Sequence, residues 1–367
     1  NISSRKVAVN NMMISDREWK EFRIIELLGK SHNSKPYHSN CLCETSEPGI
    51  PYVTRTSFNN GLYSIVCNDN YKLNPSNSIS FGAENAEYFF QPSCYITGNK
   101  MYYYYNNEYN RYIALFMVQC LNKAIYNCGF GYGMGLTGTR SDTRKIMLPV
   151  NENKEPDYAF MEAYIKEQEQ KKIQEYVAYA KIKLSKLEYK DVPVLNEKDY
   201  SNFKVLDLFS YKRGNQNNMN SLVDGNDMLI SAKNINNGLK GFFISNNEKK
   251  RAYQGNCITL NNDGDGGVGL AYYQPHEFLL DTHVYALYPK NKISKYTMLY
   301  ISLSLSKQRV CFSHGRSISQ DRLKKMRIML PVDNQGNPDY AYMEQYAKNV
   351  EYKKITQYLE YINKLKD

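Results

Sequence analysis

The stretch IMLPVNENKEPDYAFMEAYIKEQEQKKIQEY at residues 146–176 recurs at residues 328–358 as IMLPVDNQGNPDYAYMEQYAKNVEYKKITQY. The two copies are identical at 18 of 31 aligned positions, without a gap. Solenoids and propellers repeat every ~20–50 residues, a far shorter period. The stretch therefore indicates that one large module has been duplicated. Duplex DNA is the commonest partner with two similar surfaces for such a module, because its strands are related by two-fold axes.

Shorter segments recur in the same order before each copy. Residues 22–27 (FRIIEL) match residues 203–208 (FKVLDL) by type at every position. The sequence Asn-Asn-Gly-Leu follows at 59–62 and again at 236–239. Because Asn and Gly tolerate positive φ, this sequence predicts a hairpin turn. The dipeptide Gln-Pro then occurs after an aromatic residue in both halves.

Each half ends with the same kinds of element. The apolar runs 112–121 and 296–305 predict one buried helix each, and an Ile-Met-Leu-Pro-Val strand closes each globule. Such a mixture of elements is typical of an α/β (α+β) domain. We expect a first target-binding domain at 1–155 and a second at 193–337, with long helices at 156–192 and 338–367.

The long helices are predicted by their starts and by their periodicity. Pro156 and Pro338 stand where proline is tolerated, at or just before a first helical turn. No Pro or Gly follows from 157 to about 190. Apolar residues alternate in steps of four and three, the seam of a coiled coil, at Ile173, Val177, Ala180, Leu184 and Leu187 and, in the second helix, at Ile355, Leu359 and Ile362.

These seams predict that the two helices pack on each other. A pseudo-two-fold relation between the halves makes the pair antiparallel, a rod of roughly 45 Å. That length is a little over one turn of B-DNA. The alternative is that the helices are ordinary packing elements of their domains or pair with another chain.

Bulk composition narrows the class of protein. The 367 residues carry a net charge of +10, which is compatible with nucleic acid binding but does not establish it. The longest apolar run is about half the length of a membrane-spanning helix, and the first residues lack a signal-peptide pattern. The eight Cys fall at positions that do not match between the repeats, which favours free thiols in the cytoplasm. Because residue 1 is Asn, we expect the natural start to lie upstream.

The order of globule, I-x-L-P strand and long helix, occurring twice, resembles the DNA-specificity (S) subunit of type I restriction–modification enzymes. The run GRSISQDRLKKMRIMLP at 315–331 is similar to that family's strand-entry segment. The helix start Pro-Asp-Tyr-Ala-Phe/Tyr-Met-Glu is closer still to the S subunits of BcgI-like systems. The first globule departs from this pattern, with GMGLTGTR at 133–140.

The resemblance implies a role without catalysis. Each globule would read one half of a bipartite site in double-stranded DNA, and the helices would set the spacing and dock methyltransferase subunits, usually two. S-adenosylmethionine would belong to those subunits, and ATP with Mg²⁺ to restriction subunits where present. The chain itself would hold no cofactor and no catalytic centre.

Several motifs resemble those of enzymes. The sequence Asn-Pro-Asp-Tyr at 337–340 resembles the Asn-Pro-Pro-Tyr loop of amino-methyltransferases, but it opens a helix in both repeats. The glycine-rich runs 129–135 and 263–269 lack the other residues of a dinucleotide, phosphate or calcium loop. His32, His38, Cys41 and Cys43 lack the paired spacing of a zinc ribbon, so we expect a polar loop and no metal.

DNA contact is the chemistry that remains. Bases are read by Arg, Lys, Asn, Gln, Ser and Thr, while phosphates take Arg and Lys. In the first globule we expect contacts from Thr54, Arg55, Thr56, Asn59, Asn60, Arg140 and Arg144. In the second we expect them from Lys233, Asn234, Asn236, Asn237, His314, Arg316, Ser317 and Arg322.

We expect Arg140 and Arg322 to contact DNA in a different way from Arg316. Arg140 and Arg322 are equivalent in the ungapped alignment, which favours a phosphate or structural contact common to both halves. Arg316 aligns with Met134 and is the better candidate for reading a different base. Two other functions stay open on sequence alone: the targeting region of a single-chain restriction–methylation enzyme, and a duplicated scaffold that binds no DNA.

Overall fold

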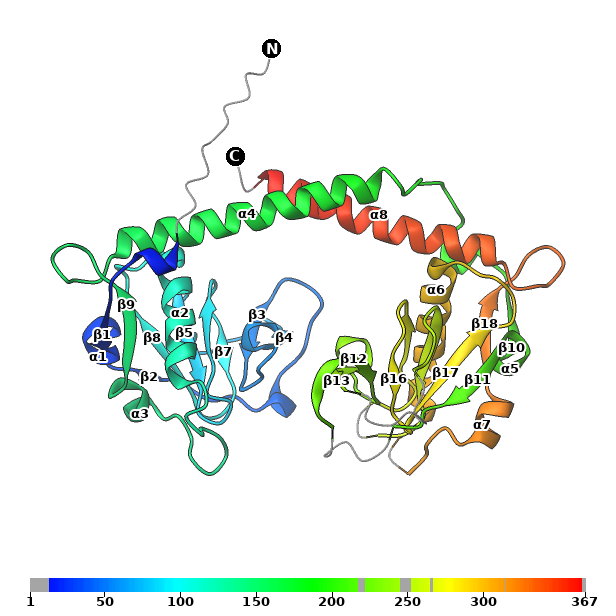
Figure 1. The fold of residues 1–367 in the computed structure, drawn as a ribbon, viewed down its shortest axis with the longest axis horizontal. Coiled ribbons are helices and arrows are strands. Elements are labelled where there is room, and N and C mark those ends of the chain that lie inside the picture. Colours follow the sequence, from blue (N-terminus) through cyan, green and yellow to red (C-terminus); the bar gives the residue numbers. More distant parts are fainter. Residues whose placement is uncertain (1–12, 217–221, 245–251, 265–266, 314, 365–367) are drawn as a thin grey trace, which may run out of the picture. The chain divides into compact units, whose positions relative to one another are not determined.

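The computed structural model describes all residues except 1–12, 217–221, 245–251, 265–266, 314 and 365–367. The chain divides into two compact units, residues 1–176 and 177–367. Both units mix strands and helices (Figure 1), so the prediction of two mixed α/β domains is confirmed.

The first strand of unit 1 leads into a short helix, and the unit ends in a long helix that continues into unit 2. Its elements are β1 (Trp19–Arg23), α1 (Ile24–Leu28), β2 (His32–Asn33), β3 (Ile50–Val53), β4 (Leu62–Val66), β5 (Ser78–Gly82), β6 (Tyr88–Gln91), β7 (Ile96–Thr97), β8 (Met101–Tyr105), α2 (Arg111–Ile125), α3 (Gly138–Asp142), β9 (Lys145–Pro149) and α4 (Tyr158–Leu184).

Unit 2 repeats this order. Its elements are β10 (Tyr200–Lys204), α5 (Val205–Leu208), β11 (Phe209–Arg213), β12 (Asp224–Ile230), β13 (Leu239–Phe243), β14 (Cys257–Asn261), β15 (Ala271–Gln274), β16 (Leu279–Leu280), β17 (Val284–Pro289), α6 (Lys295–Ser306), α7 (Gln320–Lys325), β18 (Arg327–Pro331) and α8 (Tyr340–Lys364).

Strand pairing is the same in both units. The closing strand pairs antiparallel with the first strand, β9 with β1 and β18 with β10. The register is equivalent, since Phe22 lies opposite Ile146 and Phe203 lies opposite Ile328. A four-stranded sheet has the order β2-β8-β5-β6 in unit 1 and β11-β17-β14-β15 in unit 2, and three-stranded sheets β4-β3-β7 and β13-β12-β16 accompany them. The duplication seen in the sequence is therefore a duplication of topology.

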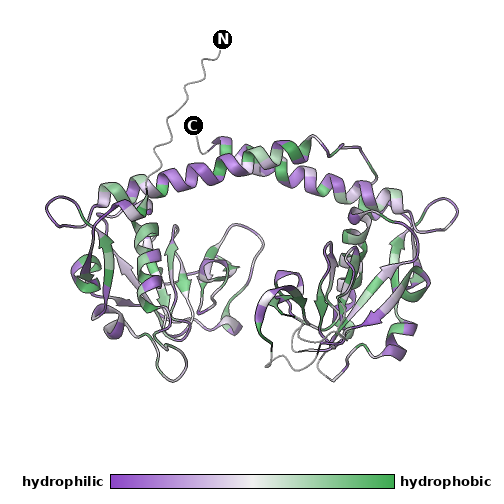
Figure 2. Ribbon diagram, viewed as in Figure 1, coloured by the Kyte–Doolittle hydropathy of each residue, from purple (hydrophilic) through white to green (hydrophobic). Residues whose placement is uncertain are grey.

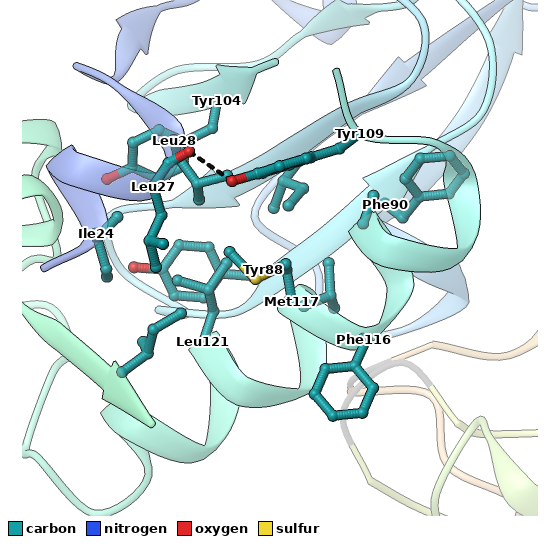
Figure 3. Packing of buried hydrophobic residues seen from close by; sticks show 14 of the residues in the cluster. Ile24, Leu27, Leu28, Tyr88, Phe90, Tyr104, Tyr109, Phe116, Met117 and Leu121 are labelled. Atoms are coloured by element: carbon teal, nitrogen blue, oxygen red, sulfur yellow. Dashed lines mark hydrogen bonds between the residues drawn. The ribbon is translucent and has the colours of Figure 1, made fainter. Parts of the chain in front are cut away.

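The core of unit 1 lies between α2 and the four-stranded sheet. Met117 and Leu121 of α2 are fully buried and belong to the same apolar cluster as Tyr88 and Phe90 of β6 (Figure 3). The Tyr109 hydroxyl donates to the Leu27 carbonyl oxygen at 2.8 Å, which ties the start of α2 to α1. The core of unit 2 uses Met298, Ile301 and Leu305 of α6 in the same way. Both predicted buried helices are confirmed.

The long helices start as predicted, and α4 ends earlier than expected. The carboxylates of Asp157 and Asp339 accept from the backbone N–H groups of Phe160 and Tyr342, both at 2.9 Å, and thus cap α4 and α8. Many residues of α4 are hydrophilic (Figure 2). The helix ends at Leu184, although no Pro or Gly interrupts the sequence up to residue 190.

A tertiary contact accounts for this earlier end. The Asn349 side chain of α8 accepts from the backbone N–H of Lys190 at 3.3 Å and donates to its carbonyl oxygen at 2.6 Å. These bonds hold the chain after α4 in a non-helical path, so the expectation of a helix to about 190 was wrong. A partner far away in sequence replaces the intrahelical bonds that propensity alone predicts.

Candidate DNA interface

The shared Asn-Asn-Gly turn of unit 1 leads from β3 into β4. β3 and β4 are antiparallel, so the predicted hairpin is confirmed, although residues 54–61 make its connection longer than a two-residue turn. Asn59 and Asn60 both have positive φ (51° and 56°), which Asn tolerates better than most residues. The backbone N–H of Thr54 donates to the Gly61 carbonyl oxygen at 2.9 Å and closes the loop.

A buried glutamine holds this turn against the four-stranded sheet. The side-chain amide of Gln91, which is 5% exposed, donates to the Asn60 carbonyl oxygen at 3.1 Å and to the Ser80 hydroxyl at 2.8 Å. The Asn60 amide in turn donates to the Phe90 carbonyl oxygen at 2.6 Å. Both asparagines of the turn are exposed, and the Asn60 amide is engaged by β6.

Unit 2 reproduces the same arrangement with different residues around it. The amide of Gln274, which is 3% exposed, donates to the Asn237 carbonyl oxygen at 2.9 Å and to the Thr259 hydroxyl at 3.0 Å. Asn236 and Asn237 have positive φ (50° and 51°). The backbone N–H of Ser231 donates to the Gly238 carbonyl oxygen at 2.8 Å. The turn is thus fixed twice by the same hydrogen bonds.

The loop before the closing strand is also built in the same way in both units. The guanidinium of Arg140 in α3 donates to the Gly135 carbonyl oxygen at 2.6 Å, and that of Arg322 in α7 donates to the Ser317 carbonyl oxygen at 2.6 Å. Both arginines remain exposed. Each therefore fastens the end of its loop and still presents charge to solvent, in keeping with a contact common to both halves.

The tip of this loop is where the units differ. Gly131 pairs with Met134 in a narrow turn in unit 1, and Ser313 pairs with Arg316 in unit 2. Met134 and Arg316 thus occupy equivalent, exposed positions. Tyr132 at the tip of the unit 1 loop is 91% exposed. Figure 1 shows this loop, between α2 and α3, extending away from the end of unit 1 that carries α4.

The two loops of unit 1 border a common hollow. A depression of 560 Å³ is lined by Ser57 from the turn loop and by Gly129 and Phe130 from the loop before α3. The structure therefore brings together two segments that are about 70 residues apart in sequence and that both carry predicted contacts. In unit 2 a hollow of 360 Å³ is lined by Lys233 of the turn loop together with His283 and Asp281.

An ion pair engages one predicted side chain of unit 1, Arg55. The guanidinium of Arg55 pairs with the carboxylate of Glu84, which also accepts from Lys100 Nζ at 2.6 Å. The hydrogen bond from Lys100, supported by the nearby charge of Arg55, lowers the pKa of Glu84. This group of two cations and one anion keeps a net positive charge beside the turn.

Arg144 points into unit 1. Its Nη2 atom donates to the Ala124 carbonyl oxygen at 3.1 Å and lies 3.0 Å from Cys128 Sγ, and its guanidinium covers the Phe130 ring. These contacts give Arg144 a role in holding the loop that follows α2. Of the remaining predicted contacts, Thr54, Thr56, Lys233 and Ser317 are half-buried, Asn234 is exposed, and His314 lies outside the described residues.

Sequence reasoning missed four residues of this site. Gln91 and Gln274 hold the turns, Lys100 adds charge beside Arg55, and Tyr132 is the exposed tip. The Gln-Pro dipeptide shared by the halves was the available signal for the two glutamines. Lys100 and Tyr132 have no counterpart in the repeat that would have pointed to them.

The predicted helix seam is mostly shielded from solvent. Four residues of the seam are buried: Ala180 in α4, Leu187 just after α4, and Ile355 and Ile362 in α8. Ile173, Val177, Leu184 and Leu359 are half-buried. Within unit 2, Lys183 Nζ lies 3.0 Å from a Glu351 carboxylate oxygen, so the last turns of α4 contact α8.

The described residues show neither a candidate metal cluster nor a membrane-spanning helix. No group of three or more His, Cys, Asp or Glu side chains among them is arranged to hold a metal ion. Among the same residues, every helix is too short or too polar to cross a lipid bilayer.

Comparison with known proteins agrees with the geometry. The model of the type I restriction–modification DNA specificity domain matches residues 16–176 and again residues 197–361. The specificity subunit S.BcgI of a type II restriction enzyme from Heyndrickxia coagulans is 27% identical over 319 residues, covering 85% of this chain and 89% of that protein.

Solved structures of specificity subunits are also similar to this chain. The S subunit of a type I restriction–modification system from M. genitalium matches with a TM-score of 0.47 and 14% identity, over 97% of this chain and 95% of that one. The HsdS subunit from Thermoanaerobacter tengcongensis matches with a TM-score of 0.32 and 13% identity, over 95% and 92%. The two matches to the family model cover most of the sequence, and the chain therefore belongs to the type I restriction–modification DNA specificity family, whose domain it carries twice.

Proposed function

We propose that each unit reads one half of a bipartite DNA target and that α4 and α8 set the distance between the halves. The specificity subunits of this family recognise DNA and are not themselves catalytic. The expected reading domains, 1–155 and 193–337, are part of this proposal, as are the spacer segments 156–192 and 338–367, which contain α4 and α8.

One observation carries the proposal of two readers. The turn loop and the loop before the closing strand are held by the same hydrogen bonds in both units, from Gln91 and Gln274 and from Arg140 and Arg322. The exposed tips differ, with Met134 in one and Arg316 in the other. Two domains that recognise different base sequences need loops held in the same way and different residues at the loop tips. The reason is that phosphate contacts position a protein on DNA, whereas base contacts specify the sequence.

The spacer role is supported by contacts inside unit 2. Lys183 meets Glu351, the Glu188 carbonyl oxygen accepts from Gln345, and the Pro193 carbonyl oxygen accepts from Tyr342. As the residue number rises from Lys183 to Pro193, the number of the contacting residue in α8 decreases from Glu351 to Tyr342. The two segments therefore run antiparallel. We propose that this pairing continues along the predicted seam as an antiparallel coiled coil, with the two halves related by a pseudo-two-fold axis.

The partners follow from the same proposal. Double-stranded DNA contacts the loops, and methyltransferase subunits, two in number, dock on the complex. S-adenosylmethionine belongs to those subunits, and ATP with Mg²⁺ belongs to restriction subunits where these are present. The complex acts in the cytoplasm, where its DNA lies.

Methylation mapping tests the proposal directly. The chain would be expressed with a methyltransferase subunit of its restriction–modification system, and methylated adenines would be mapped across the host genome. Two short fixed sequences around a fixed gap are the expected motif. A continuous motif would contradict the assignment of two readers, and no methylation by an assembled complex would favour a scaffold that binds no DNA.

Spacer length offers a matched control. Insertion of seven residues, two helical turns, into the exposed middle of α4 should lengthen the gap and leave both half-sequences unchanged, since a helix rises by about 1.5 Å per residue. An unchanged gap in an active complex would show that the helices do not set the spacing.

A further inference from the structure

Two cysteines of unit 1 lie directly opposite each other on neighbouring strand segments. The bridge between Glu44 and Val66 places Cys43 opposite Cys67, and the Cys67 backbone N–H donates to the Cys43 carbonyl oxygen at 2.8 Å. Their Sγ atoms are 2.6 Å apart. Residues paired in this way have Cα atoms about 5.5 Å apart, within the range that a disulfide spans without backbone movement.

The thiols are also accessible. Cys43 is exposed and Cys67 is half-buried, and both are free thiols in the structure. Thiol–disulfide exchange needs an accessible first thiol and a second thiol within reach of it. Because the Cys43 thiol is the more exposed of the two, we expect it to react first. The hydrogen bond to Cys43 is the largest cause of the raised pKa of Cys67.

We propose that Cys43 and Cys67 are a redox-active pair that closes to an intramolecular disulfide by exchange with a low-molecular-weight disulfide such as oxidised glutathione. The Cys43 thiolate attacks one sulfur of oxidised glutathione, and one glutathione thiolate leaves. The Cys67 thiol releases its proton to water, and its thiolate attacks Cys43 Sγ and displaces the second glutathione. The two cysteines are oxidised, and one oxidised glutathione is reduced to two glutathione molecules.

The closed pair would fasten the strand that leaves the Asn-Asn-Gly turn. Cys67 follows β4 immediately, and β4 begins directly after Gly61. Any consequence for DNA reading rests on the proposed function, whereas the disulfide itself does not. In unit 2, the described cysteines are Cys257, which is buried, and Cys311, which is exposed, so that unit provides an internal comparison.

Mass spectrometry of the intact chain tests the pair. The reduced protein would be incubated with oxidised glutathione, alkylated and digested. We expect a Cys43–Cys67 crosslinked peptide that is lighter by two hydrogen atoms and carries no glutathione, while exposed Cys41, Cys94 and Cys311 carry glutathione adducts. Dithiothreitol should reverse both kinds of product.

The variant Cys67→Ser removes the second thiol. In this variant Cys43 should retain glutathione, as Cys41 does, and the matched variant Cys41→Ser should still form the crosslink. Recovery of wild-type Cys43 as a stable glutathione adduct, or recovery of both thiols unmodified while Cys41 reacts, would overturn the proposal. Methylation of the bipartite target is not needed for either readout, so this result is separate from that of the proposed function.

Discussion

Three equivalent buried positions hold a hydrogen-bonded set of side chains in unit 1 and apolar side chains in unit 2. In unit 1 the Ser141 hydroxyl lies 2.6 Å from the hydroxyls of both Tyr88 and Tyr104, and Tyr104 donates to an Asp142 carboxylate oxygen at 2.8 Å. The repeat alignment puts Leu323 at the position of Ser141, and strand register puts Ala271 and Leu287 at those of the two tyrosines. All six side chains are buried.

The difference shows what the duplicated fold requires. The same backbone accepts either a closed set of hydrogen bonds or a set of aliphatic contacts, provided that no polar group is left without a partner. Burial raises the pKa of both Tyr88 and Tyr104, so these hydroxyls stay neutral donors. The frame common to both units thus constrains shape and hydrogen bonding, and leaves residue identity free.

The largest expected effect comes from removing the central side chain of each set. Leu323→Ala should lower the free energy of unfolding of unit 2 by about 2–5 kcal/mol, because it leaves a cavity. Ser141→Ala should cost unit 1 about 1–3 kcal/mol, because the Tyr88 hydroxyl loses its Ser141 partner, whereas Tyr104 still donates to Asp142. Hydrogen exchange followed on peptides of each unit would separate the two. A loss that appears equally in both units would break the view that each has its own core.

A second pair of variants addresses the turns. Gln274→Leu should destabilise the turn of unit 2 by about 1–3 kcal/mol, since the Asn237 carbonyl oxygen and the Thr259 hydroxyl lose their donor. Gln91→Leu should do the same in unit 1. We expect each variant to weaken the base preference in a different half of the methylated motif, as measured by sequencing. Both variants weakening the same half would contradict the assignment of one half-site to each unit.

The loop tips should sharpen the comparison further. Arg316→Ala should relax base preference in one half-site, since a bidentate arginine contributes about 1–3 kcal/mol of discrimination. Met134→Ala in the equivalent position is the control, and it should leave that half-site unchanged. Methylation profiling of both variants is the measurement. An unchanged motif with Arg316→Ala would remove this residue from the set of base readers.

Helix caps give the smallest expected effect. Burial acts to raise the pKa of Asp339, but the ion pair with Lys198 and the bond from the Tyr342 N–H outweigh it and lower that pKa. The stabilising contribution of a carboxylate with a lowered pKa is present above its unfolded pKa, about 3.9, and is lost as the pH falls through the folded value. Asp339→Ala should cost about 1 kcal/mol at neutral pH.

Thermal unfolding at several pH values tests the cap. The gap in melting temperature between wild type and Asp339→Ala should narrow below pH 4, where the wild-type carboxylate becomes protonated. Asp157→Ala, at the equivalent cap of α4, is the matched variant in the other unit. A gap that stays constant into acid would mean that the charge of Asp339 does not stabilise α8.

Local patterns in the sequence were enough for much of the frame. Identical residues at the start of each long helix, an apolar run for each buried helix and the Asn-Asn-Gly turn predicted elements that the structure contains, because helix caps, periodicity and positive φ are properties of a few adjacent residues. The repeat alone also predicted that Arg140 and Arg322 are equivalent. The structure adds that their guanidinium groups donate to the carbonyl oxygens of Gly135 and Ser317.

What remained needed partners far away along the chain. Asn349 ended α4 before residue 190, Glu84 engaged Arg55, and the opposed strands brought Cys43 to Cys67. The sequence by itself determined the duplication, the element order and the family resemblance. Tertiary structure alone decided which predicted side chains are engaged in contacts within the protein and which remain exposed at a loop tip. These contacts join residues far apart in the sequence, and no sequence periodicity indicates them.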